Sequence, residues 1–200
     1  MTRFVLGIAC VAVLVAVGCA PRTLAGPEGP VPNLAGYVPT PMEVVERMLQ
    51  LAEVSKDDVV YDLGSGDGRI PILAARRYGA RGVGIEIDPD LVALSERSAR
   101  RQRVEHLVSF RRQDALTVDV SPATVVTLYL SDEANGQLRP TLQAQLPRGA
   151  RVVSHTFRMG DWAPDAVVRV TSHLGQEHVL YLWRVTRTFR TSRGADGTTD

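Results

Sequence analysis

A run of β-branched and apolar residues leads directly into a glycine-rich turn near the middle of the chain. Residues 58–63 (DVVYDL) have the composition of a buried strand, and residues 64–68 (GSGDG) form a tight turn. A helix is expected from about Arg69, with Pro71 in its first turn and Gly79 at its end. This order of elements is the first unit of an open α/β sheet, which binds ligands at the carboxyl ends of its strands.

Strands and helices continue to alternate after this unit. Further strands are expected at residues 81–87, 107–111, 123–130 and 150–155, followed by an antiparallel hairpin of residues 166–172 and 177–185. Helices are expected at 42–54, 88–103 and 132–146, the last interrupted by Gly136 and Pro140. The pattern predicts an α/β fold: a doubly wound, mainly parallel seven-stranded sheet with a C-terminal antiparallel hairpin.

Cysteine usage and charge exclude several classes of function. The two cysteines, Cys10 and Cys19, lie in an N-terminal apolar stretch, so the rest of the chain has no cysteine-ligated metal, disulfide scaffold or cysteine nucleophile. No metal site is predicted. With 23 Lys and Arg against 22 Asp and Glu the net charge is +1, and the arginines between residues 97 and 112 are not interleaved with aromatic residues. A nucleic-acid partner is therefore not expected.

The first twenty residues have the features of a targeting segment. Arg3 precedes an apolar run from Phe4 to Val17, and residues 15–19 (VAVGC) resemble a lipoprotein signal in which Cys19 is lipidated. An uncleaved membrane anchor facing the cytoplasm is the alternative, and a misassigned start codon is a third. We thus expect a membrane-associated protein with a signal or anchor at 1–20, a linker at 21–36, a folded domain at 37–185 and a flexible tail at 186–200.

The residues around the glycine turn favour a cationic, amino-acid-like ligand. Asp62, two residues before Gly64, would repel a pyrophosphate but suits a positive charge. The turn lacks the third glycine of a dinucleotide motif, because Arg69 stands there, and it lacks the G-K-[ST] of a phosphate loop. Glu86, about twenty residues further on, is placed to bind a ribose diol. Amino acid, ribose and positive charge together describe S-adenosylmethionine.

The same residues resemble the motifs of class I S-adenosylmethionine-dependent methyltransferases. Residues 59–69 (VVYDLGSGDGR) resemble motif I, 84–88 (GIEID) the following acidic motif, and 112–115 (RQDA) the segment whose Asp contacts adenine. This resemblance implies S-adenosylmethionine as cofactor. It also implies a set of cofactor-binding residues, namely Asp62, Gly64, Ser65, Gly66, Asp67, Gly68, Glu86, Ile87, Asp114 and Ala115.

A narrower resemblance concerns the methyl acceptor. Residues 37–41 (YVPTP), 62–70 (DLGSGDGRI) and 138–140 (LRP) resemble bacterial relatives of the non-SET lysine methyltransferases of mitochondrial membranes. The resemblance implies N-methylation, possibly of a protein lysine. No [ND]-P-P-[YF] segment follows the fourth strand, which argues against adenine or glutamine-amide methylation.

Five further residues are candidates for the acceptor end of the site. Tyr129 and Asp132 are the candidate catalytic residues, and Tyr37, Thr40 and His155 are the candidate substrate contacts. Three of them have a structural alternative: rim packing for Tyr129, a helix start for Asp132 and a satisfied structural role for His155.

Three functions therefore compete. The first is a methyltransferase acting by in-line transfer to nitrogen. The second is a non-catalytic, membrane-tethered nucleoside-binding module, because a lipoprotein signal would export the domain away from the compartment that makes S-adenosylmethionine. The third is an NAD-linked oxidoreductase, which shares the order of strand, glycine turn and acidic residue.

Overall fold

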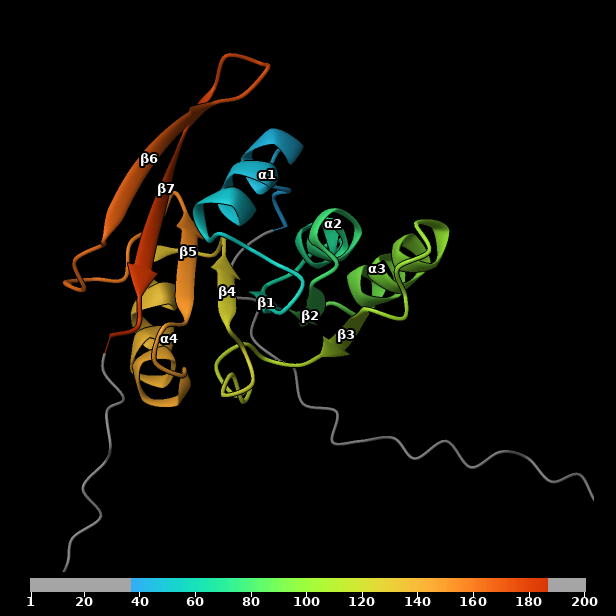
Figure 1. Cartoon of the computed structure of the whole chain (residues 1–200), viewed down its shortest axis with the longest axis horizontal. Helices are drawn as coiled ribbons and strands as arrows, with labels where there is room; N and C mark the ends of the chain where they lie inside the picture. Colours follow the sequence, from blue (N-terminus) through green and yellow to red (C-terminus); the bar gives the residue numbers. More distant parts are fainter. Residues whose placement is uncertain (1–36, 187–200) are drawn as a thin grey trace, which may run out of the picture. The chain divides into compact units, whose positions relative to one another are not determined.

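A seven-stranded sheet forms the centre of the computed structural model, which describes residues 37–186 (Figure 1). Its strand order is β3-β2-β1-β4-β5-β7-β6. The strands are β1 Val59–Leu63, β2 Arg81–Glu86, β3 Val108–Arg112, β4 Val125–Leu128, β5 Arg151–His155, β6 Ala166–Thr171 and β7 Glu177–Arg184. Strands β1 to β5 are parallel, and β7 pairs antiparallel with both β5 and β6. The predicted fold class is confirmed.

The predicted terminal segments fall almost entirely beyond the described part of the chain. The signal or anchor at 1–20, with Cys19, and the linker at 21–36 lie outside the described residues, as does the tail at 186–200 apart from Thr186. Between residues 37 and 186, none of the helices has the length and apolar character needed to cross a bilayer.

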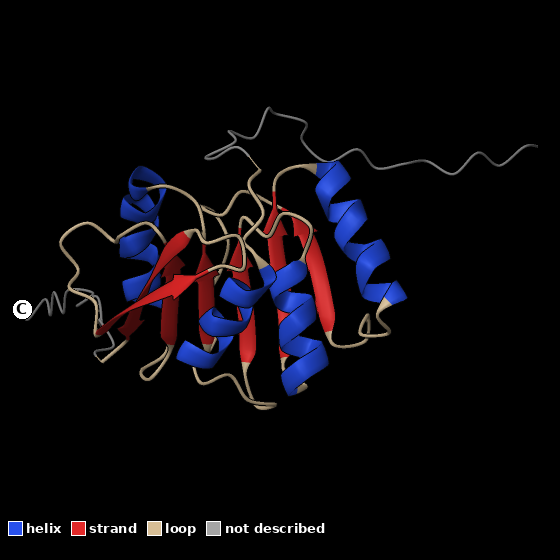
Figure 2. Ribbon diagram, turned by 90° about the horizontal axis from the view of Figure 1, so that it is seen from above, coloured by secondary structure: helices blue, strands red, loops and turns tan. Residues whose placement is uncertain are grey.

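Helices cover both faces of the sheet, as Figure 2 shows. They are α1 Met42–Leu51, α2 Arg69–Tyr78, α3 Pro89–Arg101 and α4 Asp132–Gln145. Side chains alternate along the central strands, so Val60 packs in the cluster with α1 and α2, whereas Tyr61 packs in the cluster with α4. α3 packs beside α2 in a third, smaller cluster. Both faces of the sheet are therefore buried, as a parallel sheet requires.

The ends of α2 and the start of α3 follow the sequence signals, whereas the middle of α4 does not. α2 lies between Gly68 and Gly79, which both have left-handed backbones, and the Asp88 side chain caps α3 by accepting from the Asp90 N–H. The predicted interruption of α4 is wrong, because the helix runs unbroken through Gly136 and Pro140. Both residues are exposed, so water can satisfy the Gly136 carbonyl that loses its partner at Pro140.

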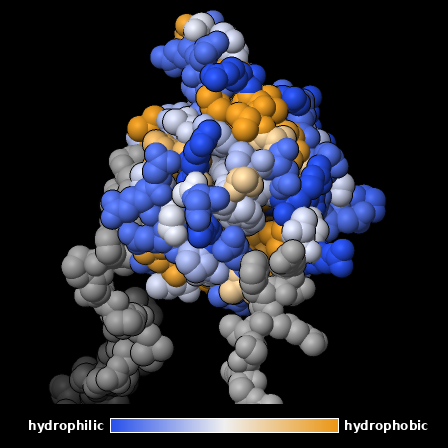
Figure 3. All heavy atoms as spheres, turned by 90° about the vertical axis from the view of Figure 1, so that its left-hand side faces the viewer, coloured by the Kyte–Doolittle hydropathy of each residue, from blue (hydrophilic) through white to orange (hydrophobic). Residues whose placement is uncertain are grey.

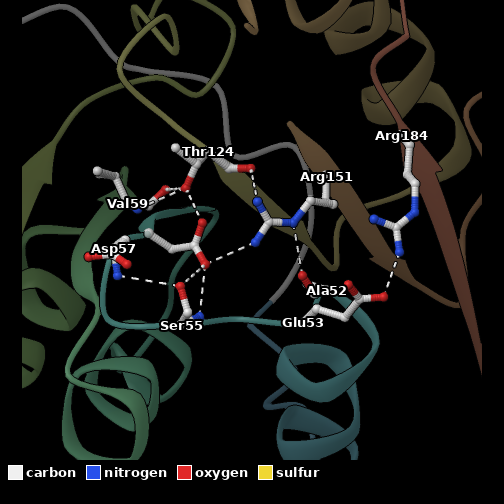
Figure 4. A network of polar contacts seen from close by, with 9 residues as sticks. Ala52, Glu53, Ser55, Asp57, Val59, Thr124, Arg151 and Arg184 are labelled. Carbon is white, nitrogen blue, oxygen red and sulfur yellow. Dashed lines mark hydrogen bonds and ion pairs between the residues drawn. The ribbon is translucent and has the colours of Figure 1, made fainter. Parts of the chain in front are cut away.

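A buried ion pair joins three elements at the amino ends of the strands (Figure 4). Arg151 lies 2.9 Å from the Asp58 carboxylate and donates to the carbonyl of Ala52. Asp58 also accepts from the Thr124 hydroxyl at 2.7 Å and from the Ser55 N–H at 2.8 Å. Burial raises the pKa of Asp58, but these donors outweigh it and the pKa is lowered overall. The network fixes the end of α1 against β1 and β5.

The β6–β7 hairpin forms the last edge of the sheet and projects beyond it. Figure 3 views this side: hydrophilic side chains dominate the face, and apolar groups gather just below the projecting tip. Leu174, in the tip, is the most exposed of the large apolar residues between 37 and 186. β7 carries His178, a half-buried side chain that reaches back toward β5.

Candidate active site

The glycine turn lies between β1 and α2, and two side chains approach its backbone closely. Gly66 has a φ of 54°, and a Cβ there would lie 2.5 Å from the ring of Tyr37. Gly64 has a φ of 80°, and a Cβ there would lie 2.5 Å from Leu130. Only glycine fits both the backbone and the space at these two positions.

Main-chain donors fix the carboxylate of Glu86 at the end of β2. One oxygen accepts from the Gly66 N–H at 2.8 Å, and the other accepts from the N–H groups of Ile87 at 2.7 Å and Asp88 at 3.0 Å. These bonds connect the glycine turn after β1 with the turn after β2. Glu86 is thereby held in one orientation on the wall of a cavity.

Asp62 is a carboxylate buried at the end of β1. It is 3% exposed, lines the same cavity and accepts a hydrogen bond of 2.7 Å from Thr127. Burial raises the pKa of Asp62 to about 7, and the charges of Glu86 and Asp67 add to the rise. A carboxylate in this state gains from a ligand that brings a positive charge.

Arg69 connects the turn to the segment that precedes α1, residues 37–41, which we call the strap. Its guanidinium binds both oxygens of Asp67, at 2.8 and 2.6 Å, and donates to the carbonyl of Thr40 at 2.8 Å. Burial raises the pKa of Asp67, but the hydrogen bonds and charge of Arg69 outweigh it, so the pKa is lowered overall. This role has no signal in the sequence, where Arg69 begins a predicted helix, ends the segment that resembles motif I and replaces a dinucleotide-motif glycine.

Asp114 and Ala115 follow β3 and line the cavity from a third strand end. One oxygen of Asp114 accepts from the Leu116 N–H at 2.9 Å. That bond orients the side chain and leaves its second oxygen available. The acidic residues at the ends of β1 and β2 and just after β3 therefore surround one space, as predicted from the topology.

Tyr129 lines the other end of the cavity, and a buried histidine lies behind it. The Tyr129 ring lies on the His155 ring with centroids 4.0 Å apart, and His155 Nδ1 is 3.2 Å from Thr40 Oγ1. His155 is fully buried behind these two residues and does not itself line the cavity. Burial, and then the neighbouring His178, lowers the pKa of His155 to about 4.

The cavity has a volume of about 890 Å³ including its open mouth, within the range of small-molecule sites. Twelve of the fifteen predicted site residues within the described chain line it, namely Tyr37, Thr40, Asp62, Gly64, Ser65, Gly66, Asp67, Glu86, Ile87, Asp114, Ala115 and Tyr129. Arg69, Leu91, Gln113 and Leu130 also line it and were not predicted. Gln113 had a signal in the sequence, since it directly precedes Asp114.

Two of the predicted residues lie elsewhere. Gly68 faces away from the cavity, where a Cβ would lie 2.6 Å from Phe110, so its small size serves helix packing. Asp132 begins α4, is exposed and accepts from the Arg158 N–H at 2.9 Å. The helix-start alternative therefore describes Asp132 better than a catalytic role does.

Comparison with known sequences gives one family and several relatives. The family model described as the ANTKMT methyltransferase domain matches residues 62–166. A protein-lysine N-methyltransferase of Saccharolobus islandicus is 42% identical over 148 residues, which cover 74% of this chain and 91% of the relative. The adenine nucleotide translocase lysine N-methyltransferase of Mus musculus is 40% identical over 66% of this chain, which spans only 57% of the mouse enzyme.

Comparison of structures gives a similar result. A crystal structure described as an RNA methyltransferase from Salinibacter ruber, in complex with S-adenosyl-L-homocysteine, is 52% identical with a TM-score of 0.72. The match covers 77% of this chain and 97% of that one. The relatives' names thus agree on methyl transfer and differ on the acceptor.

Proposed function

The chain belongs to the ANTKMT methyltransferase family, and from this membership we propose that it transfers a methyl group from S-adenosylmethionine to the amine of a protein lysine. The observation that carries the proposal is the convergence of Asp62, Glu86 and Asp114 on one cavity around the glycine turn. The lysine acceptor is supported by the names of the archaeal and mouse relatives.

The residues present fit S-adenosylmethionine. Asp62, buried and with a raised pKa, suits the positive charge of the cofactor's methionine part. Glu86, held by three main-chain donors, is placed for a ribose diol, and Asp114 with the N–H of Ala115 suits adenine. Gly66 keeps the backbone free of a side chain at the point where Tyr37 closes over the turn.

The chain contributes to the reaction by aligning the acceptor with the methyl donor and by excluding water from the cavity. S-adenosylmethionine supplies, when bound, a methyl group on a sulfonium, and in-line transfer then needs a positioned, unprotonated nucleophile. Tyr37 and Tyr129 give the cavity aromatic walls, which attract a cationic amine. Thr40 adds a hydroxyl at the same end.

RNA is the second candidate acceptor, because the Salinibacter structure is described as an RNA methyltransferase and is the more identical relative. Protein is favoured for this chain because its net charge is only +1, which gives little attraction to a phosphate backbone. Methylation of protein and methylation of RNA give different products, so a single labelling experiment distinguishes the two acceptors.

The experiment uses the full chain, methyl-labelled S-adenosylmethionine and a bacterial lysate freed of its own cofactor. Protein and RNA are separated and hydrolysed. We expect the label in ε-N-methyllysine. Label in methylated nucleosides would instead establish the RNA function. Cofactor binding without incorporation into either pool would favour the binding module, and a melting temperature raised by NAD alone would favour the oxidoreductase.

We also propose that residues 1–20 hold the domain at a membrane, either through a lipidated Cys19 after export or through an uncleaved anchor facing the cytoplasm. The proposal is supported by the apolar run from Phe4 to Val17 and the VAVGC segment. Reporters fused to the C-terminus, one active only in the cytoplasm and one only outside it, distinguish the two forms. Recovery of the full chain wholly in the soluble fraction would contradict both.

A further inference from the structure

We propose that Thr40, His155 and His178 form a proton relay that removes a proton from the amine nucleophile and carries it to the outer hairpin. The inference rests on the proposed function in one respect, which is that the acceptor is an amine. A lysine amine is protonated at neutral pH and must lose a proton before its nitrogen can attack.

The three side chains form a continuous hydrogen-bonded line from the cavity to the edge of the sheet. Thr40 lies in the strap and lines the cavity, and its Oγ1 is 3.2 Å from His155 Nδ1 on β5. His155 Nε2 is 2.9 Å from His178 Nδ1 on β7. Both ring nitrogens of His155 are therefore engaged, one toward the cavity and one away from it.

The distal nitrogen of His178 distinguishes this arrangement from an ordinary structural histidine pair. A structural histidine is usually fixed in one tautomer by a partner on its second nitrogen. His178 Nε2 is buried and has no hydrogen-bond partner among residues 37–186. Nothing in this part of the chain therefore locks the pair in one tautomer, so the shared proton can lie on either ring.

The surroundings of His155 keep its ring neutral, which is the form that a proton relay needs. The titratable side chains that face it are Tyr129, with ring centroids 4.0 Å apart, and His178, with centroids 5.0 Å apart. The lowered pKa of His155, which follows mainly from burial, keeps the ring neutral at pH 7. A neutral imidazole accepts at one nitrogen while it donates from the other.

Each proton in the sequence can be followed. An N–H bond of the ammonium breaks, and Thr40 Oγ1 takes that proton while passing its own to His155 Nδ1. His155 releases its Nε2 proton to His178 Nδ1, and His178, whose buried Nε2 keeps its own proton, holds the added proton as an imidazolium on the hairpin. The amine, now with a free electron pair, forms the N–C bond as the S–C bond breaks, and the electrons of that bond go to sulfur.

The test compares His178→Asn with the matched variant His173→Asn in the same hairpin, where His173 is exposed and outside the line. An Asn side chain can still accept from His155 Nε2 but cannot take up a proton. Initial rates of methyl incorporation into lysate protein are measured with the full chain from pH 6 to 10. Melting temperature and cofactor affinity verify that both variants fold and bind.

We expect His173→Asn to follow the wild-type profile. His178→Asn should be roughly 100-fold slower at pH 7, the usual contribution of general base catalysis. Its rate should then rise about tenfold per pH unit toward the lysine pKa of about 10.4, because only amines that lose their proton unaided can react. Unchanged activity, or a loss that is constant across pH, would overturn the relay.

A second measurement does not depend on the acceptor or on the variants. In the wild-type protein labelled with ¹⁵N-histidine, the ring nitrogens of His155 and His178 should show two exchanging tautomers, and their balance should shift when sinefungin, which carries an amine near the methyl position, is added. One fixed tautomer that ignores sinefungin would refute the inference. If wild type methylates no lysine, the proposed function fails, and this spectrum still decides the relay.

Discussion

The hydroxyl of Thr127 on β4 donates a hydrogen bond of 2.7 Å to the carboxylate of Asp62 on β1. Thr127 is fully buried in a strand whose other residues are all apolar. The bond crosses between the two strands at which the sheet order reverses, where ligands bind in such folds. Thr127, the polar residue of this strand, therefore orients the Asp62 carboxylate of the cofactor site.

Thr127→Val removes this hydrogen bond and keeps the shape of the side chain. Because the Thr127 hydroxyl lowers the pKa of Asp62, its loss should favour the protonated acid and weaken binding of a cation. We expect the affinity for S-adenosylmethionine to fall by about 1 kcal/mol at pH 7. The loss should shrink at pH 9, and calorimetry at the two pH values would measure both effects. Equal affinity to wild type at pH 7 would count against the role of Asp62.

Cofactor binding should release protons near neutral pH. The pKa of Asp62 is about 7 without a ligand, so a large fraction of the carboxyl is protonated at pH 6.5. A positive charge beside it lowers that pKa, and the proton is released. Calorimetry in two buffers of different ionisation enthalpy should report a release that vanishes in Asp62→Asn and above pH 9. Proton uptake on binding would contradict this account.

Arg69→Met should detach the strap from the glycine turn. The substitution removes the double contact with Asp67 and the hydrogen bond to Thr40, while the aliphatic stem is kept. We expect roughly tenfold weaker cofactor binding and faster proteolytic cleavage at Tyr37. Arg76→Met, on the same helix but exposed, is the matched control. Cleavage at Tyr37 at the wild-type rate would show that another contact holds the strap.

Asp58→Asn should destabilise the fold without touching the site. It leaves the partly buried Arg151 without its ion pair, and breaking a buried pair typically costs about 3 kcal/mol. The folded pKa of Asp58 lies below its unfolded value, so the stabilisation is present above pH 4 and disappears as the pH falls through the folded pKa. Urea unfolding should show a difference between wild type and variant that is large at pH 7 and smaller at pH 3. An equal difference at both pH values would show that the ionised Asp58 carboxylate is not the source of this stabilisation.

The sequence predicted the fold and the cofactor end of the cavity because both depend on local signals. Strand ends in a parallel sheet meet at one edge, so Asp62, Glu86 and Asp114 could be placed together from the order of elements alone. The helix caps at Gly79 and Asp88 also follow from neighbouring residues. These features need no knowledge of distant contacts.

The acceptor end could not be predicted in the same way, because it depends on contacts between residues far apart in the chain. Arg69 reaches Thr40 across 29 positions, and Thr40 reaches His155 across 115. His178 meets His155 only because β7 returns beside β5. The continuity of α4 depended on solvent exposure around Gly136, which the pattern of residues does not specify.

The most direct measurement is calorimetric titration of the full chain with S-adenosylmethionine, alongside Asp62→Asn, Glu86→Gln and the control Glu96→Gln on the exposed side of α3. We predict one molecule bound per chain, affinity lowered at least about tenfold in the first two variants and unchanged in the control. Absence of binding in wild type, or binding that neither Asp62 nor Glu86 affects, would contradict the assignment of this cavity as the methyl-donor site.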